Sequence, residues 1–128
     1  MGKVDWVIHM VVGDYGPGGI VNSHTHGMDN YNHMDFQLVL PLGKEQTMSL
    51  LNTICFEVQS GERFAPGYYQ SETVYSCAFR LELFRETGRS VLRLIFPDPN
   101  MYFPEEFDCE HPYKYQTCRA FEDTGCWS

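Results

Sequence analysis

Basic residues are scarce in this chain, and their scarcity excludes one large class of partner. The 128 residues contain nine Lys and Arg against seventeen Asp and Glu, for a formal net charge of −8. Proteins that bind nucleic acid neutralise phosphates with a basic stripe or patch, which nine scattered cations do not form. We therefore expect no nucleic-acid partner, and we interpret the acidity as an aid to solubility.

Long apolar runs are also missing. No stretch of the sequence approaches the roughly 20 apolar residues that a membrane-spanning helix needs. The first residues, Met1 to Asp5, do not begin the apolar segment and small-residue cleavage site of a secretory signal. We expect a cytoplasmic protein that makes no membrane contact.

The signatures of several common catalytic and cofactor sites are absent. The sequence has no C-x-x-C, G-x-S-x-G, P-loop or G-x-G-x-x-G motif. Its cysteines are odd in number, and Cys55 and Cys77 fall at apolar positions typical of buried thiols. The other three lie near the C-terminal end: Cys109, Cys118 and Cys126. A disulfide among these three is disfavoured in a reducing cytosol.

What the chain does contain is enough apolar and aromatic residues for a core. Apolar residues make up 43% of the sequence and aromatic residues 15%, so residues 1–128 can form one domain. The tail from about residue 107 is irregular and aromatic. Apolar or alternating runs predict five strands, the last two joined as a hairpin. These runs are Asp5–Val12, Ile20–Thr25, Phe36–Leu40, Tyr75–Leu83 and Val91–Phe96.

One stretch, residues 43–61, has helical periodicity. Leu51, Ile54, Cys55 and Val58 recur at a spacing that places them on one face of a helix. Glycine at the end of the stretch is typical of a helix C-terminus. Together with the strands, this pattern predicts an α+β domain, in which one mostly antiparallel sheet of four to six strands is packed by a single main helix.

The segment His24-Thr25-His26 holds the most informative polar residues. Residues two apart in a strand point to the same face, so the two imidazoles are expected to lie side by side. Such a pair can bind a metal such as zinc, bind an anion or transfer a proton. It can also be a hydrogen-bonded pair without chemistry, and the sequence leaves these interpretations open.

A zinc site needs three or four ligands, so the pair alone is incomplete. Asp29 and His33 lie close in the sequence, whereas His9 and His111 would have to come from elsewhere in the fold. None of these spacings is a recognised zinc signature. The metal interpretation therefore depends on which further side chain the fold brings to the pair.

A second candidate is the turn around Asp98, which stands between Pro97 and Pro99 at the end of a predicted strand. Prolines restrict the backbone on both sides and hold the carboxylate in one direction. Such a carboxylate can act as a base or a ligand, or it can accept hydrogen bonds from its own turn. The candidate catalytic residues are His26 from the histidine pair and Asp98 from this turn.

Several short motifs also occur in an order typical of one family. They are His24–Met28, His33–Phe36, Leu50–Asn52, Phe96–Asn100, Phe103-Pro104 and Tyr115-Gln116. By their order and spacing, over roughly Val4 to Gln116, the chain resembles the bacterial domain-of-unknown-function family 4262. It departs from that family at His24, where tyrosine is common, and at Glu105, where tryptophan is common. The resemblance implies a bacterial α+β domain and carries no activity or cofactor to transfer.

We predict that the chain binds a small ligand or a protein partner near the histidine pair and the aspartate turn. The residues of this predicted site are His24, Thr25, His26, Pro97, Asp98 and Phe103. Two alternatives stay open. One is a metal-dependent, hydrolase-like enzyme with His24 and His26 as metal ligands, and the other is an immunity- or defence-type interaction module. Any of these can act as a homodimer.

Overall fold

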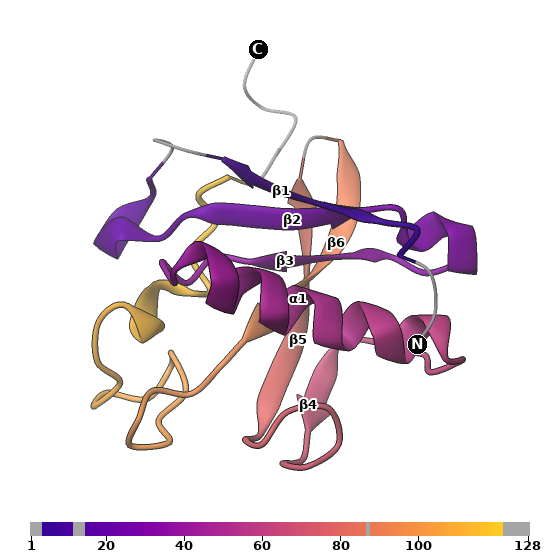
Figure 1. The fold of residues 1–128 in the computed structure, drawn as a ribbon. Coiled ribbons are helices and arrows are strands. Elements are labelled where there is room, and N and C mark those ends of the chain that lie inside the picture. The colour runs from indigo at the N-terminus through magenta and orange to yellow at the C-terminus, as the bar shows by residue number, and fades with distance from the viewer. Residues whose placement is uncertain (1–3, 12–14, 87, 122–128) are drawn as a thin grey trace.

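The computed structural model describes residues 4–11, 15–86 and 88–121, and these form one six-stranded sheet with a single α-helix (Figure 1). The strands are β1 (Val7–Val11), β2 (Asn22–His26), β3 (Asp35–Leu38), β4 (Gly67–Tyr69), β5 (Phe79–Glu86) and β6 (Arg89–Ile95). The helices are α1 (Lys44–Gln59) and three short 3-10 helices, η1 (Pro17–Gly19), η2 (Met28–Tyr31) and η3 (Tyr113–Tyr115). The predicted α+β class is confirmed.

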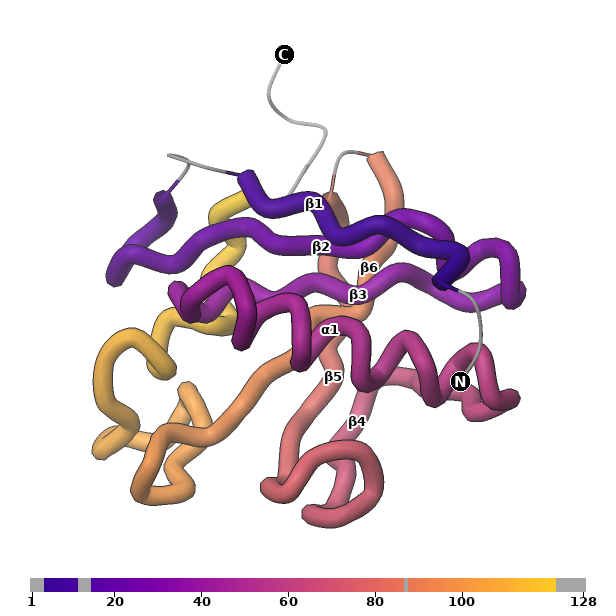
Figure 2. Tube along the Cα trace, viewed as in Figure 1, coloured from indigo at the N-terminus to yellow at the C-terminus, as the bar shows by residue number. Residues whose placement is uncertain are grey.

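The sheet has the order β1-β2-β3-β6-β5-β4, and only the pairing of β3 with β6 is parallel. That parallel pair joins two antiparallel units, one formed by β1 to β3 and the other by β4 to β6. Strands in a sheet are rotated relative to their neighbours, and here the two units run in clearly different directions (Figure 2). The hairpin that joins β5 and β6 thereby comes close to β1 and β2.

Helix α1 covers one face of the sheet and forms the main core with it. Leu51, Ile54 and Cys55 are fully buried, as the helical pattern predicts, and they pack in one cluster with Phe36 and Leu92. Burial raises the pKa of the Cys55 thiol to about 12, so this cysteine acts as a small apolar side chain. Among the described residues, no helix is both long and apolar enough to cross a bilayer.

The opposite face of the sheet is covered in part by the segment that follows β6, drawn in orange to yellow in Figure 1. Phe84 is buried there, and the guanidinium of Arg119 from the tail lies 5.4 Å from the centre of its ring. Leu83 points the other way and is 51% exposed. The alternation within the run Tyr75–Leu83 predicts Leu83 on the buried face, and this prediction is wrong because at this end of β5 the buried positions, Phe84 and Glu86, lie on the opposite face.

Two other strand predictions differ from the structure. Residues 67–69, for which no strand was predicted, pair with β5 as the short edge strand β4. The strand expected from Tyr75 begins instead at Phe79, although the ring of Tyr75 is buried and its hydroxyl donates a hydrogen bond to the carbonyl of Leu50. The alternating pattern thus identified a buried side chain without identifying its backbone conformation.

Candidate metal centre

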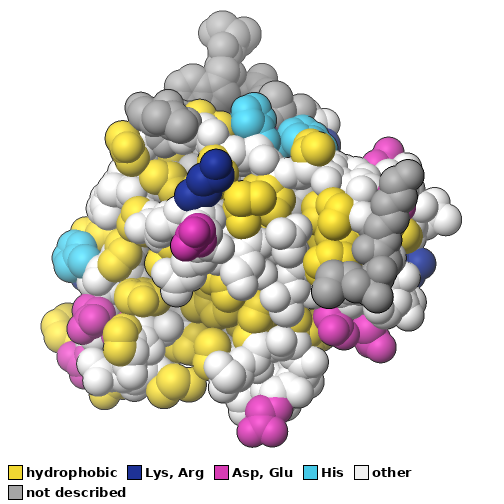
Figure 3. Space-filling model, in the orientation of Figure 1, with side chains coloured by type: hydrophobic (Ala, Val, Ile, Leu, Met, Phe, Trp, Pro, Cys, Tyr) yellow, Lys and Arg dark blue, Asp and Glu magenta, His cyan; other side chains and the backbone are white. Residues whose placement is uncertain are grey.

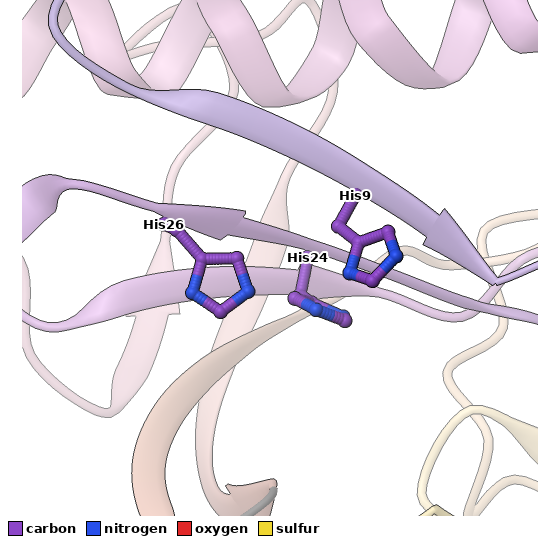
Figure 4. A group of neighbouring side chains, drawn as sticks. All are labelled: His9, His24 and His26. Carbon is purple, nitrogen blue, oxygen red and sulfur yellow. The ribbon is translucent and has the colours of Figure 1, made fainter.

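Three histidines come together on adjacent strands of the sheet. His9 in β1 lies directly opposite His24 in β2, and His26 follows two residues later on the same strand. Directly opposed residues of paired strands, and residues two apart, share one face of a sheet. Figure 4 shows the three rings side by side on one side of the β1–β2 pair.

The rings are close enough to share one metal ion. The centroid of the His24 ring lies 5.0 Å from that of His9 and 4.9 Å from that of His26. One nitrogen from each ring can be chosen so that all three nitrogens lie within 4.8 Å of one another. Tetrahedral zinc with Zn–N bonds of 2.0–2.1 Å needs nitrogens about 3.4 Å apart. His9 and His26 are exposed, so small side-chain rotations can close this difference.

The rings line an open hollow of about 480 Å³ that also contains two charged side chains, Glu86 and Arg89. The Glu86 carboxylate is buried, and its Oε1 lies 3.6 Å from Nε2 of His24. Its other oxygen, Oε2, accepts a hydrogen bond of 3.0 Å from Nε of Arg89. Figure 3 shows histidine side chains at the surface in the upper part of the view.

Arg89 is itself fixed by β2 and β3, which makes the position of Glu86 rigid. Nη1 of Arg89 donates to Oδ2 of Asp35 at 2.6 Å, and Nη2 of Arg89 donates to the carbonyl of Thr25 at 2.8 Å. The second oxygen of Asp35 accepts hydrogen bonds from the Thr25 hydroxyl and the Met28 amide. A carboxylate held in this way meets the histidines with little reorganisation.

The imidazole of His24 is in the protonation state that a metal ligand needs. The pKa of His24 is lowered to about 4, chiefly by burial; the nearby His26, Arg89 and His9 act in the same direction, while Glu86 opposes the shift. His24 is therefore neutral at neutral pH. Neutral imidazole is the form that binds metals.

The structure unites His24 and His26, as the strand pattern predicts, and adds His9 from the neighbouring strand. Glu86 and Arg89 were missed, because the sequence between β5 and β6 indicates only a turn. Thr25, expected in the ligand site, points to the other face, where its hydroxyl bonds to Asp35 and to the Phe36 amide.

Asp98 is not brought to the histidines. Its carboxylate accepts hydrogen bonds from the amides of Asn100, Tyr102 and Glu110, all within its own turn and the segment packed on it. It follows the far end of β6, a strand whose seven residues span about 20 Å from the Arg89 end. The structure therefore favours the structural interpretation of Asp98.

The remaining predicted residues also lie elsewhere. Pro97 lines a different cavity of about 260 Å³ beside Leu50 and Tyr113. The ring of Phe103 packs against Tyr68 and near the guanidinium of Arg80. Of the other histidines, His33 accepts a hydrogen bond from the Phe64 amide, and His111 packs on Tyr115. Cys109 and Cys118 are free thiols, and Cys126 lies outside the described residues.

In three comparisons with known proteins, no family model, no curated protein and no solved structure matched this chain. Its resemblance to the domain-of-unknown-function family 4262 stays a prediction, and the functional argument depends on the site alone.

Proposed function

We propose that this protein binds a divalent transition metal, zinc above all, through His9, His24 and His26. One observation carries the proposal: three ring nitrogens, contributed by two paired strands, lie within 4.8 Å of one another. Three imidazoles suit zinc, and three protein ligands leave one position of a tetrahedral site open. Structural zinc sites, by contrast, are closed by a fourth protein ligand.

An open position supports metal-dependent hydrolysis as the activity. Zinc in such a site lowers the pKa of bound water to about 7 and polarises carbonyl or phosphoryl groups. The buried carboxylate of Glu86 lies beside His24, where it can accept a proton from water. The hollow of about 480 Å³ falls in the size range of small-molecule sites, so the predicted small ligand is here the substrate.

The first test is the metal content of untagged protein, because a polyhistidine tag would itself bind metal. After removal of metal with a chelator, titration calorimetry with zinc should give one ion bound per chain. His9→Ala, His24→Ala and His26→Ala should each abolish or strongly weaken this binding. Zinc should also restore hydrolysis of an activated ester by the metal-free protein, and Glu86→Gln should reduce the rate without removing the metal.

The matched control is His111→Ala, which removes an exposed imidazole far from β1 and β2 in the sequence and packed on Tyr115. This variant should bind zinc as the original chain does. Zinc binding that survives all three cluster substitutions, or is lost in His111→Ala, would overturn the proposal. We place the activity in the cytoplasm, which agrees with the four free thiols among the described residues.

A further inference from the structure

A row of buried side chains runs across β2, β3 and β6, from the histidine cluster to Arg93. Nε of Arg93 in β6 donates to Oε1 of Gln37 in β3 at 2.7 Å. Nε2 of Gln37 donates to Oδ1 of Asn22 in β2 at 3.0 Å, and the same oxygen lies 3.1 Å from Nδ1 of His24. None of these four side chains is more than 6% exposed.

The direction of every hydrogen bond in this row follows from Arg93. A guanidinium only donates, so the Gln37 atom that faces it must be the amide oxygen. The other end of that amide is then an NH₂ group, so the Asn22 atom that meets it must be an oxygen. That oxygen can only accept, and the ring nitrogen of His24 beside it must therefore carry a proton.

The guanidinium of Arg93 is fixed in its place at the start of the row by contacts with several other groups. Its guanidinium carbon lies 3.6 Å from the centre of the Phe84 ring, a close cation–π contact. Its Nη1 donates to the carbonyls of Gln116 and Cys118 in the C-terminal tail, at 2.8 and 2.6 Å. The fixed donor at one end of the row thus sets the proton at the other end.

We propose that Arg93, acting through Gln37 and Asn22, fixes His24 in the tautomer that carries its proton on Nδ1 and presents the lone pair of Nε2 to the hollow. This inference rests on the proposed function for its purpose, since a metal ligand must offer a lone pair. Arg93, Gln37 and Asn22 are positioning residues, because they act through His24. Partners of this kind fix the tautomer and ring orientation of metal-binding histidines.

The position of Glu86 agrees with this assignment. Nε2 of His24 and Oε1 of Glu86 lie 3.6 Å apart, which is long for a hydrogen bond. With the proton on Nδ1, two lone pairs face each other across this gap. A proton on Nε2 would instead be expected to close this gap to an ordinary hydrogen bond with the carboxylate.

The decisive experiment is ¹⁵N NMR of the histidine rings in metal-free wild-type protein at neutral pH, with His24 assigned from a His24→Gln spectrum. We expect the Nδ1–H tautomer, in which Nε2 resonates at the higher ¹⁵N shift. A ring with its proton on Nε2, or on both nitrogens, would overturn the inference. No substitution in the row is needed for this result, so a folding defect cannot obscure it.

Two variants with the same added charge test the role of the row. Asn22→Asp still accepts from both Gln37 and His24, so it should keep the tautomer. Gln37→Glu accepts from Arg93 but cannot donate, so Asn22 should turn its NH₂ group toward His24 and move the ring proton to Nε2. Zinc should then bind about 10–100-fold more weakly to Gln37→Glu than to Asn22→Asp. Equal affinities, or an unchanged tautomer in folded Gln37→Glu, would show that the row does not control His24.

Failure of this inference can be told apart from failure of the proposed function. Zinc bound to a protein whose metal-free His24 carries its proton on Nε2 would leave the metal site intact and overturn the inference. An Nδ1–H tautomer in a protein that binds no zinc would keep the inference and overturn the proposed function.

Discussion

At the scale of single residues, two buried carboxylates of this protein have different environments. The carboxylate of Asp98 is saturated by three backbone amides, whereas that of Glu86 meets a guanidinium on one side and an imidazole on the other. The first arrangement holds a turn together. The second leaves a carboxylate oxygen directed at a ring nitrogen, and this is where a cation or a proton can be bound.

Replacement of Asp98 by Asn should destabilise the fold in a pH-dependent way. Burial raises the pKa of Asp98, but the amides of Tyr102, Glu110 and Asn100 outweigh it and lower the pKa below its usual value. A lowered folded-state pKa means that the ionised carboxylate adds stability above the unfolded pKa of about 3.9 and loses it as pH falls through the folded value. The loss of stability in Asp98→Asn should be full above about pH 5 and should shrink toward pH 2.

Urea unfolding of both proteins between pH 2 and pH 7 measures this difference. Asp108→Asn is a suitable control, because it removes an exposed carboxylate close by in the sequence. If the gap between Asp98→Asn and the original chain is the same at pH 2.5 and pH 7, the amides around Asp98 do not favour its ionised form.

At the scale of helices and strands, the local patterns of the sequence predicted most of the fold. Helix α1, the β5–β6 hairpin and the shared face of His24 and His26 all follow from spacing along a continuous segment. Strand β4 was missed because three residues, Gly67-Tyr68-Tyr69, are too few for a periodic pattern. The parallel pairing of β3 with β6 joins segments about fifty residues apart, and no local signal reports it.

The same distinction explains which site residues could be predicted. His9 was one of four possible additions to the pair, and only the register of β1 against β2 selects it. Glu86 and Arg89 reach the site because the sheet twists and brings the end of the hairpin to β2. Asp98 is not part of the site, because the direction of β6 places it beyond the end of that strand opposite to Arg89. This direction also cannot be read from local patterns of the sequence.

Truncation of the core face of α1 should be costly. Leu51→Ala removes a fully buried side chain from the main cluster, and we expect it to lower the free energy of unfolding by about 2–5 kcal/mol. Leu50→Ala removes the same atoms from a half-buried position next in the sequence and should cost less. Chemical denaturation of the two variants compares them directly. Equal losses would mean that the helix does not bury the face described here.

At the scale of the whole molecule, the sheet is stabilised on both faces by different means. Helix α1 supplies an apolar layer on one face. On the other face lies the C-terminal segment around residues 116–119, called the strap here, which makes polar contacts with the sheet. The strap is fixed by Arg93 and by Gln116, whose side chain is fully buried. Because Arg93 bonds to the strap and also begins the row that ends at His24, the tail and the histidine cluster belong to one connected unit.

The last prediction concerns this strap. The side-chain amide of Gln116 bonds to the backbone of Phe96 as a neighbouring strand would. Its Oε1 accepts a hydrogen bond from the Phe96 backbone N–H at 2.8 Å, and its Nε2 donates to the Phe96 carbonyl at 2.6 Å. Gln116→Ala leaves both buried backbone groups without this partner and should lower the free energy of unfolding by about 1–3 kcal/mol. Hydrogen exchange at the Phe96 backbone amide should also become faster in this variant.

Gln46→Ala provides the control, because it truncates an exposed glutamine on α1 and should change neither quantity. Gln116→Glu separates the two bonds, since a carboxylate still accepts from the Phe96 amide but cannot donate to its carbonyl. It should therefore protect the amide better than Gln116→Ala does while remaining less stable than the original chain. Unchanged exchange at Phe96 in Gln116→Ala would show that the strap is not held to β6 by this side chain, and the coupling of the tail to Arg93 would then depend on its carbonyls alone.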